Sequence, residues 1–194
     1  MSNEFLRTMS ERRSVSTVDD SAPGDDELRE LLAAVVPVAD HKGLRPWRLV
    51  VHRGDDRLRV GDALAQGDLK GKQEPEAKEV ERFRKKATRA PLLIAIIAER
   101  RSRKLPKWEQ EAVASGAAHL LELALFAAGW GVMWRSGVGT ETKAVRRLYG
   151  LEKRDRLLGW LYVGGIPERS DGTRTTKPKK RPDPAQFLGR LPAE

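Results

Sequence analysis

Apolar and polar positions along this chain follow two alternating patterns, one typical of helices and one typical of strands. The helical pattern is clearest in DDELRELLAAVV, where Leu28, Leu31, Leu32 and Val35 lie three or four residues apart until Pro37. Because such a stripe faces a core on one side only, it predicts an amphipathic helix. Similar spacing or composition predicts further helices within residues 2–11, 54–64, 78–90, 107–129 and 140–150.

Four short apolar runs predict strands. LLIAIIA at 92–98 contains no polar residue, which is typical of a strand buried on both faces. The other runs are 47–52, 130–135 and 157–167. Because strands alternate with helices and no internal repeat occurs, the pattern predicts an α+β class with one sheet in a single domain, residues 1–194.

The longest predicted helix, 107–129, is apolar around nearly its whole circumference. Such a helix needs cover on all sides, so it belongs at a domain centre or at a subunit interface. Its apolar stretch approaches membrane-spanning length, but Ser115, His119 and Glu122 interrupt it. We therefore expect a buried core helix and no membrane partner.

Composition narrows the class of protein. The chain is 39% hydrophobic and 34% charged, which is typical of a soluble globular protein. It contains no cysteine, so disulfides and thiolate metal sites are excluded. The N-terminal residues lack an apolar signal-peptide core, and together with the missing cysteines this favours a cytoplasmic location.

The net charge is +9, and we place most of the excess cations in two runs, 80–89 and 174–182. Neither run interleaves aromatic residues with cations, as single-strand binding surfaces do. For 80–89, a solvated helix face and a ligand-binding role remain equally open. A nucleic-acid-binding module stays a weaker alternative, and no nucleic acid is expected.

Several kinds of chemistry lack their motifs. The glycine-rich dinucleotide fingerprint and the P-loop are both absent. The three histidines have no metal-ligand spacing, so no metal site is expected. Glu109 and Glu111 open the long helix, where they favour its positive dipole end rather than acid–base work. The sequence is not that of a hydrolase.

Three segments have residues suited to an anionic or planar ligand. In ERRSVS, two arginines and a serine at a helix end can bind a phosphate, although such residues are often solvated. In WGVMWRSG, a glycine turn lets a ligand approach the backbone closely, although a core tryptophan with a surface arginine is the simpler reading. ADHKGLRPWRLVV places a histidine, three cations and a tryptophan at the start of a strand.

Taken in order, these segments resemble the nitroreductase family of FMN flavoproteins. RRSVS, DHKGLRPWRLVV, RAPLLIAIIA, LPKWEQEAVASGAAHLLELALFAAGWGVMWRSG, LYGL and LLGWLYVGGIP occur in the family's order and spacing, over residues 4 to 188. The likeness is closest to a short bacterial subgroup. It implies a mixed, mostly antiparallel sheet flanked by helices, in an intertwined homodimer with two FMN sites at the interface. It also implies a mobile segment near 67–78 and an extended basic arm, 168–194.

The resemblance implies an activity as well. NAD(P)H would give a hydride to flavin N5, and the flavin would reduce a small electron acceptor such as a nitroaromatic or a quinone. No side chain is needed as a catalytic acid or base for the hydride itself. A flavin-binding sensor or store without turnover is the main alternative.

The resemblance also carries cofactor contacts onto particular residues. Arg12 and Ser14, with Arg13 beside them, match the residues that hold the FMN phosphate and ribityl chain, and Lys180 matches a basic residue of the C-terminal arm that reaches the phosphate. The remaining contacts come from the loop before the first strand and from the turn facing flavin N5: His41, Arg45, Trp134, Arg135, Ser136 and Gly137.

Two positions depart from the family's common pattern. Ser16 stands where many relatives have a lysine near flavin N1, and Arg45 stands where a glutamine is common before Pro-Trp. A cation near N1 stabilises the negative charge of reduced flavin. Arg135 or Arg45 could supply it, so the departures bear on the flavin potential and the substrate rather than on the fold.

Overall fold

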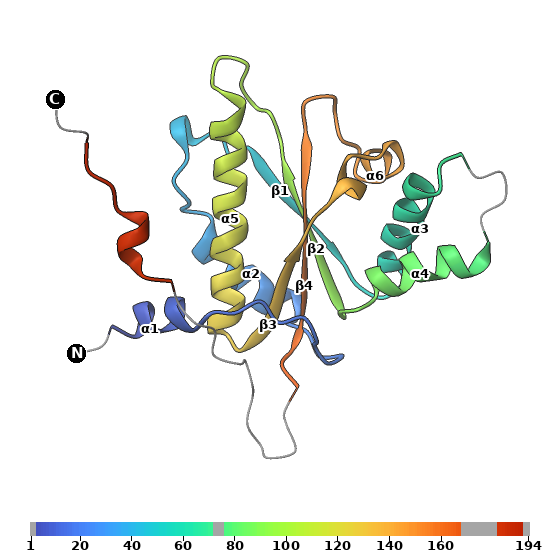
Figure 1. Ribbon diagram of the computed structural model, residues 1–194, viewed down its shortest axis with the longest axis horizontal. Helices are drawn as coiled ribbons and strands as arrows, with labels where there is room; N and C mark the ends of the chain where they lie inside the picture. The colour runs from blue at the N-terminus through green and yellow to red at the C-terminus, as the bar shows by residue number, and fades with distance from the viewer. Residues whose placement is uncertain (1–2, 72–75, 168–181, 192–194) are drawn as a thin grey trace.

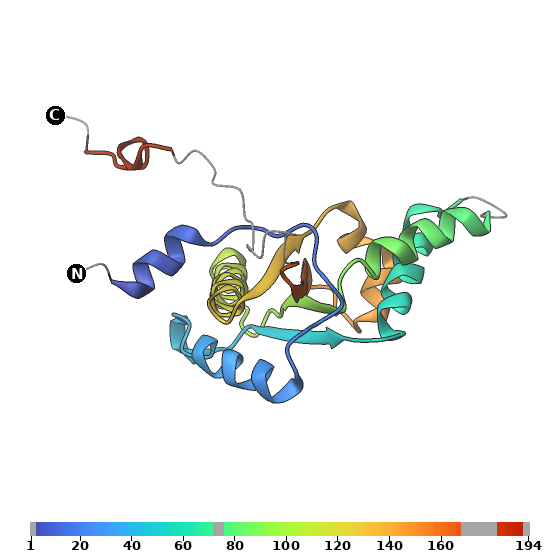
Figure 2. The same ribbon diagram turned by 90° about the horizontal axis from the view of Figure 1, so that it is seen from below.

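The computed structural model describes residues 3–71, 76–167 and 182–191 and has three layers (Figure 1). A four-stranded sheet lies between α2 and α5 on one face and the group α3, α4 and α6 on the other, as the views in Figures 1 and 2 agree. The α-helices are α1 (Glu4–Glu11), α2 (Asp25–Val35), α3 (Asp56–Asp68), α4 (Ala77–Ala87), α5 (Lys107–Ala127) and α6 (Lys143–Leu148). The strands are β1 (Trp47–His52), β2 (Leu92–Ala98), β3 (Trp130–Arg135) and β4 (Arg156–Gly165), and the short 3₁₀ helices are η1 (His41–Gly43), η2 (Val138–Glu141) and η3 (Pro184–Phe187).

The sheet has the order β1-β2-β4-β3, and each neighbouring pair is antiparallel. All seven residues of β2 are buried, which confirms the expectation from its unbroken apolar sequence. The predicted α+β class is likewise confirmed. Because β1 and β3 are the two edge strands, the loop that enters β1 and the loop that leaves β3 lie at opposite edges of the sheet.

A bulge brings β4 and the end of β3 unusually close. The β2–β4 register shifts between Ile96 and Ile97, opposite Gly159. Gly159 has a φ of 132°, and a Cβ added there would lie 2.4 Å from the Arg135 carbonyl oxygen. Only glycine fits this left-handed, crowded position. The close approach fixes where the chain leaves the sheet at Arg135.

Each face of the sheet has its own hydrophobic core, and we call these the α5-side core and the α3-side core. Since side chains alternate along a strand, neighbouring residues of one strand enter different cores. The buried members of the α5-side core are Leu28, Val35, Leu92, Ile94, Ile96, Ala117, Ala118, Leu121, Leu125, Val132, Leu161 and Val163. Those of the α3-side core are Val60, Ala63, Ala87, Ala90, Leu93, Ala95, Ile97, Val145, Tyr149, Leu157, Trp160 and Tyr162.

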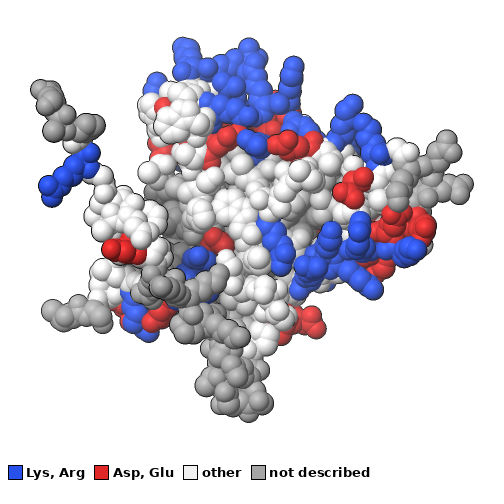
Figure 3. All heavy atoms as spheres, viewed as in Figure 1, with Lys and Arg blue, Asp and Glu red and all other residues white. Residues whose placement is uncertain are grey.

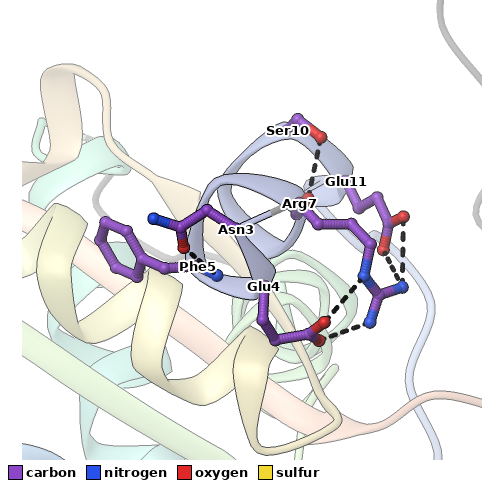
Figure 4. Close-up of polar contacts among 6 residues, drawn as sticks. All are labelled: Asn3, Glu4, Phe5, Arg7, Ser10 and Glu11. Atoms are coloured by element: carbon purple, nitrogen blue, oxygen red, sulfur yellow. Dashed lines mark hydrogen bonds and ion pairs between the residues drawn. The ribbon is translucent and has the colours of Figure 1, made fainter. Parts of the chain in front are cut away.

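Helix α1 pairs its charges within itself and exposes its apolar side (Figure 4). The guanidinium of Arg7 lies between the carboxylates of Glu4 and Glu11. No residue of α1 is buried. Its exposed apolar side chains are Phe5 at 59%, Leu6 at 60% and Met9 at 49%.

The segment expected to be mobile begins as ordered helix. Helix α3 continues to Asp68, and the buried Ala65 and Leu69 pack with Phe83 of α4. The helix therefore extends past the predicted end at residue 64. Within the three described ranges, no helix is long and apolar enough to cross a membrane.

Candidate functional site

The segment after α1 runs along the free edge of β3. The Val15 amide donates to the Val132 carbonyl at 2.9 Å, and the Asp19 amide donates to the Gly165 carbonyl at 3.0 Å. Gly131 permits this packing, because a Cβ there would lie 2.9 Å from Val18 Cγ1. Gly131 points to the same face of the sheet as Arg135, four residues on. The segment is thus held against the α3-side face of β3.

Two guanidinium groups in this segment have buried nitrogens without partners. Arg13 Nη1 donates to the carbonyls of Ser10 at 2.9 Å and Arg12 at 2.8 Å. Arg12 Nη1 and Arg13 Nε are buried and make no hydrogen bond. Leaving a buried donor unsatisfied costs about 1–3 kcal/mol, and more when it is charged. Beside the exposed hydroxyl of Ser14, these donors suit a phosphate.

A cavity of about 760 Å³ opens where β3 ends. Its walls combine the turn after β3, two aromatic side chains from β4 and three cations from β3 and the end of α4. Arg135 lies over the Tyr162 ring, with its Cζ 5.6 Å from the ring centroid. The cavity is lined by Leu64, Gly67, Asp68, Phe83, Lys86, Arg89, Trp134, Arg135, Ser136, Gly137, Val138, Gly139, Thr142, Trp160 and Tyr162.

Lys86 and Arg89 are cavity residues that the sequence interpretation did not single out. Both belong to the basic run 80–89, for which a solvated face was an equal alternative. Lys86 Nζ lies 4.8 Å from the centroid of the Phe83 ring, which is buried. The i,i+3 spacing of Phe83 and Lys86 places the cation beside the buried face of the helix, but the same spacing also fits a cation in water.

One aromatic residue of the cavity wall, Trp160, belongs to a buried polar network. The Trp160 indole N–H donates to Tyr149 Oη at 2.7 Å, and Tyr149 Oη lies 3.0 Å from His52 Nε2. Burial raises the pKa of Tyr149 and lowers the pKa of His52. Burial also raises the pKa of Tyr162, against the opposing effect of Arg135 and Arg89. At neutral pH these groups are uncharged, so the cavity's positive potential comes from its cations.

The side chain of Trp134 packs on the α5-side face of the sheet, opposite to the cavity. Its indole packs with the α5-side core, and its Nε1 donates to the Leu158 carbonyl at 3.1 Å. Its ring also meets His119 of α5, at 5.0 Å between ring centroids. Trp134 is therefore anchored in the core, while Arg135, Ser136 and Gly137 carry the chain past the cavity.

The loop before β1 is a separate, conformationally strained cluster. Lys42 and Arg45 have φ of 65° and 49°, which costs a non-glycine residue about 1–2 kcal/mol. The Arg45 amide donates to Asp40 Oδ2 at 2.5 Å, and His41 Nδ1 lies 2.9 Å from Glu109 Oε2 in the first turn of α5. These contacts hold His41 and Arg45 in place at the N-terminal end of α5.

One copy of the chain does not bring all the predicted contacts together. His41 and Arg45 precede edge strand β1, whereas Arg135 ends the opposite edge strand β3. Three interstrand spacings of about 4.8 Å separate these edges, roughly 14 Å in total. Arg12 and Ser14 lie on the β3 side, and Lys180 lies outside the described residues. Within the described part of the chain, no cluster of histidine and carboxylate side chains is suited to a metal ion.

Comparison with known proteins gives consistent results. The model of the nitroreductase family matches residues 9–165. YdjA of Escherichia coli strain K12, named provisionally as an NAD(P)H nitroreductase, is 34% identical over 186 residues, covering 95% of this chain and 98% of YdjA.

Solved structures share the fold at lower sequence identity. A nitroreductase-like family protein from Bacillus cereus has a TM-score of 0.82 at 22% identity, covering 98% of this chain and 97% of that one. The FMN and NADPH-dependent nitroreductase NfnB from sphigopyxis sp. strain HMH has a TM-score of 0.72 at 16% identity, covering 96% and 98%. At these identities the likeness concerns the fold alone.

Proposed function

The chain belongs to the nitroreductase family, and from this premise we propose that it is an FMN-dependent oxidoreductase that passes a hydride from NAD(P)H to a small electron acceptor. Nitroaromatics and quinones are the acceptor classes that the family suggests. When bound, FMN supplies the hydride chemistry by accepting and then releasing two electrons and a proton. The choice of NAD(P)H as donor and of a nitroaromatic as acceptor rests on the names of the relatives. The choice of FMN as cofactor is also supported by the geometry of this chain.

The observation that carries the proposal is the pair of unpartnered buried nitrogens, Arg12 Nη1 and Arg13 Nε. They lie on a segment packed against the same face of β3 from which Arg135 enters the cavity. A flavin mononucleotide has a phosphate at one end and a planar ring at the other. Arg12, Arg13 and Ser14 would hold the phosphate, and the cavity would take the ring.

The cavity residues have distinct roles under this proposal. The backbone of Ser136 and Gly137 approaches the ring closely, because a glycine there leaves space for the ligand. Arg135 offers a fixed positive charge, and Lys86 of α4 and Arg89, two residues after that helix, add to it. Such preorganised cations stabilise negative charge that develops in the site. We assign no catalytic acid or base, since orientation and charge suffice for hydride transfer.

A second copy of this chain completes the site under the same proposal. His41 and Arg45 lie on the edge of the sheet away from the cavity, so a partner subunit is needed to bring such a loop to it. Unpartnered apolar side chains favour a homodimer: besides the exposed face of α1, Trp108 of α5 is 68% exposed. Sedimentation should give a dimer, and a stable, flavin-loaded monomer would contradict this. We also place the protein in the cytoplasm, where NAD(P)H is supplied.

The non-catalytic alternative keeps the flavin but has no turnover. The nucleic-acid alternative loses support, because Lys86 and Arg89 of the basic run line a cavity rather than an open face. Figure 3 shows Lys and Arg side chains mixed with carboxylates in most places on this view, without one continuous basic surface.

The proposal is tested by the absorbance spectrum of the purified protein and by anaerobic reduction. We expect one FMN per chain, bleaching of the flavin on addition of NADPH or NADH, and recovery of its colour when a nitroaromatic or a quinone is added. Flavin that is bound but not bleached would identify a sensor or store. A colourless protein that does not take up added FMN would refute cofactor binding altogether.

A further inference from the structure

A second large cavity, of about 850 Å³, lies between α3, α4 and α6. No part of the cofactor assignment uses it. Its lining residues come mainly from α3 and the turn after it, with one from α4 and three from α6, and these three helices cover the same face of the sheet (Figure 1). It is lined by Arg59, Asp62, Ala63, Ala65, Gln66, Leu69, Lys70, Gly71, Val80, Ala144, Arg147 and Leu148.

A smaller cavity of about 340 Å³ lies between the two. It shares Gly67 and Thr142 with the cofactor cavity, and it shares Lys70, Arg147 and two further residues with the second cavity. Gly67 is required at the junction, because a Cβ there would lie 2.5 Å from Thr142 Oγ1. The three cavities therefore follow one another along α3.

The chemistry of the second cavity is that of a site for a partly apolar anion. Leu69, Val80 and Leu148 give it apolar walls, and cations stand around them. Within the described ranges, the side chains of Lys70 and Arg147 make no ion pair or hydrogen bond. Arg59, in contrast, is paired with Asp56 at 3.0 Å. Apolar walls with a few convergent polar groups are typical of small-molecule sites.

We propose that this cavity binds the phosphorylated adenosine end of NADPH, with Lys70 and Arg147 contacting its 2′-phosphate. This inference rests on the proposed function, since it assigns one end of the hydride donor. Lys70 and Arg147 line both the second cavity and the smaller one, so they lie at the end of the second cavity that faces the cofactor cavity. A ligand that reaches them from the cofactor cavity extends past Gly67, with a reactive ring at one end and an anionic group at the other. A dinucleotide has this form, and adenine supplies the planar body for the apolar walls.

The first test measures binding without turnover. Adenosine 2′,5′-bisphosphate and adenosine 5′-monophosphate are titrated calorimetrically into the FMN-loaded protein and into the double variant Lys70→Ala/Arg147→Ala. Both side chains are exposed, so the substitutions leave the fold intact. We expect at least a tenfold weaker affinity for the bisphosphate in the double variant, in line with loss of charge-assisted contacts. Lys85→Ala, an exposed lysine on α4 outside the cavity, is the matched control and should change the affinity less than twofold.

The second test separates the donor from an anionic acceptor, because a nitroaromatic carboxylate has similar chemistry. KM is measured for NADPH, NADH and 4-nitrobenzoate in the same proteins. The proposal requires that the double variant raise KM for NADPH about tenfold, with kcat unchanged and with NADH and 4-nitrobenzoate little affected. A rise for 4-nitrobenzoate alone would assign the cavity to the acceptor and overturn the proposal, as would unchanged bisphosphate affinity.

The outcome is independent of the main proposal. A wild-type protein that never takes up FMN refutes the oxidoreductase function through its spectrum. In that case the bisphosphate is titrated into the flavin-free protein, and the titration still decides the cavity because it needs neither flavin reduction nor an acceptor.

Discussion

The two faces of the sheet are built differently, although the same strands supply both. The buried members of the α5-side core are all aliphatic, with Trp47, Trp130 and Trp134 packed against them, and a cavity of about 440 Å³ lies at the surface between α2 and β1. The α3-side core contains Trp160, Tyr162 and the buried Tyr149–His52 contact, and three cavities adjoin it. The first face supports the sheet, whereas the second is the face that we propose receives the ligand.

Unsatisfied groups distinguish the faces further. On the α5 side, Trp130 Nε1 donates to Glu27 Oε1 at 2.7 Å, and Glu122 Oε2 lies 3.2 Å from His119 Nδ1. Glu111 Oε1 of α5 is buried without a hydrogen bond, but it forms an ion pair with Lys107 at 3.3 Å. At the C-terminal end of α1, in contrast, Arg12 Nη1 has neither a hydrogen bond nor an ion pair among the described residues. Native proteins rarely leave such donors without a partner from the protein, from ordered water or from a ligand. The comparison predicts that substitutions in the α5-side core change the free energy of unfolding, whereas substitutions on the α3 side change the affinity for FMN.

The largest effect is expected for Arg12→Ala combined with Ser14→Ala. Each lost charge-assisted bond to the phosphate costs about 1.5–3 kcal/mol, so two losses weaken FMN binding by a hundredfold or more. The double variant should purify without flavin, which the visible absorbance spectrum measures. Arg7→Ala is the control, because Arg7 is paired with Glu4 and Glu11 on the same helix. Full flavin content in the double variant would show that the phosphate binds elsewhere.

The next largest effect concerns the α5-side core. Leu121 is fully buried there, and Leu121→Ala should lower the free energy of unfolding by about 2–5 kcal/mol through lost contacts and a residual cavity. FMN affinity per folded molecule should stay within a few-fold of wild type. Urea denaturation and a flavin titration measure the two quantities. Leu121→Met, which conserves volume, should cost less than about 1.5 kcal/mol. A large loss of flavin affinity in Leu121→Ala would mean that the faces are coupled.

The elements of both faces could be predicted from the sequence, because burial imposes a visible period on them. The unbroken LLIAIIA of β2 and the apolar circumference of α5 are examples. Lys86 and Arg89 could not be assigned from pattern alone, since a cation beside a cavity and a cation in water have the same sequence. The separation of His41 from Arg135 could not be predicted from the sequence either, because it depends on the strand order β1-β2-β4-β3. Local periodicity does not encode that order.

Arg135→Gln should have a moderate effect confined to the binding face. Arg135 stacks over Tyr162 in the cavity, and its charge would stabilise reduced flavin. We expect a lower FMN midpoint potential and about tenfold slower reduction by NAD(P)H, equivalent to about 1.4 kcal/mol of barrier, with flavin still bound. Stopped-flow kinetics and a redox titration measure these. Arg45→Gln, which restores the commoner family residue in the separate loop, is the matched comparison. A shift in Arg45→Gln and none in Arg135→Gln would transfer the role to Arg45.

The smallest effect is expected at His52, where a single buried group makes the stability of the α3 side depend on pH. Burial is the main cause of the lowered pKa of His52, and Arg59 lowers it further against the opposing effect of Asp56. In the unfolded chain the imidazole takes up a proton near its ordinary pKa of 6.5, whereas the folded protein keeps it neutral to lower pH. The unfolded state then binds more protons, so the free energy of unfolding falls as pH drops below about 6.5.

The variant His52→Gln tests this cause, because glutamine can still hydrogen-bond Tyr149 but does not titrate. Urea denaturation at about pH 7.5 and about pH 5.5 should therefore show a larger loss of stability on acidification in wild type than in the variant. Equal losses would place the pH dependence of this protein's stability in groups outside the α3-side core.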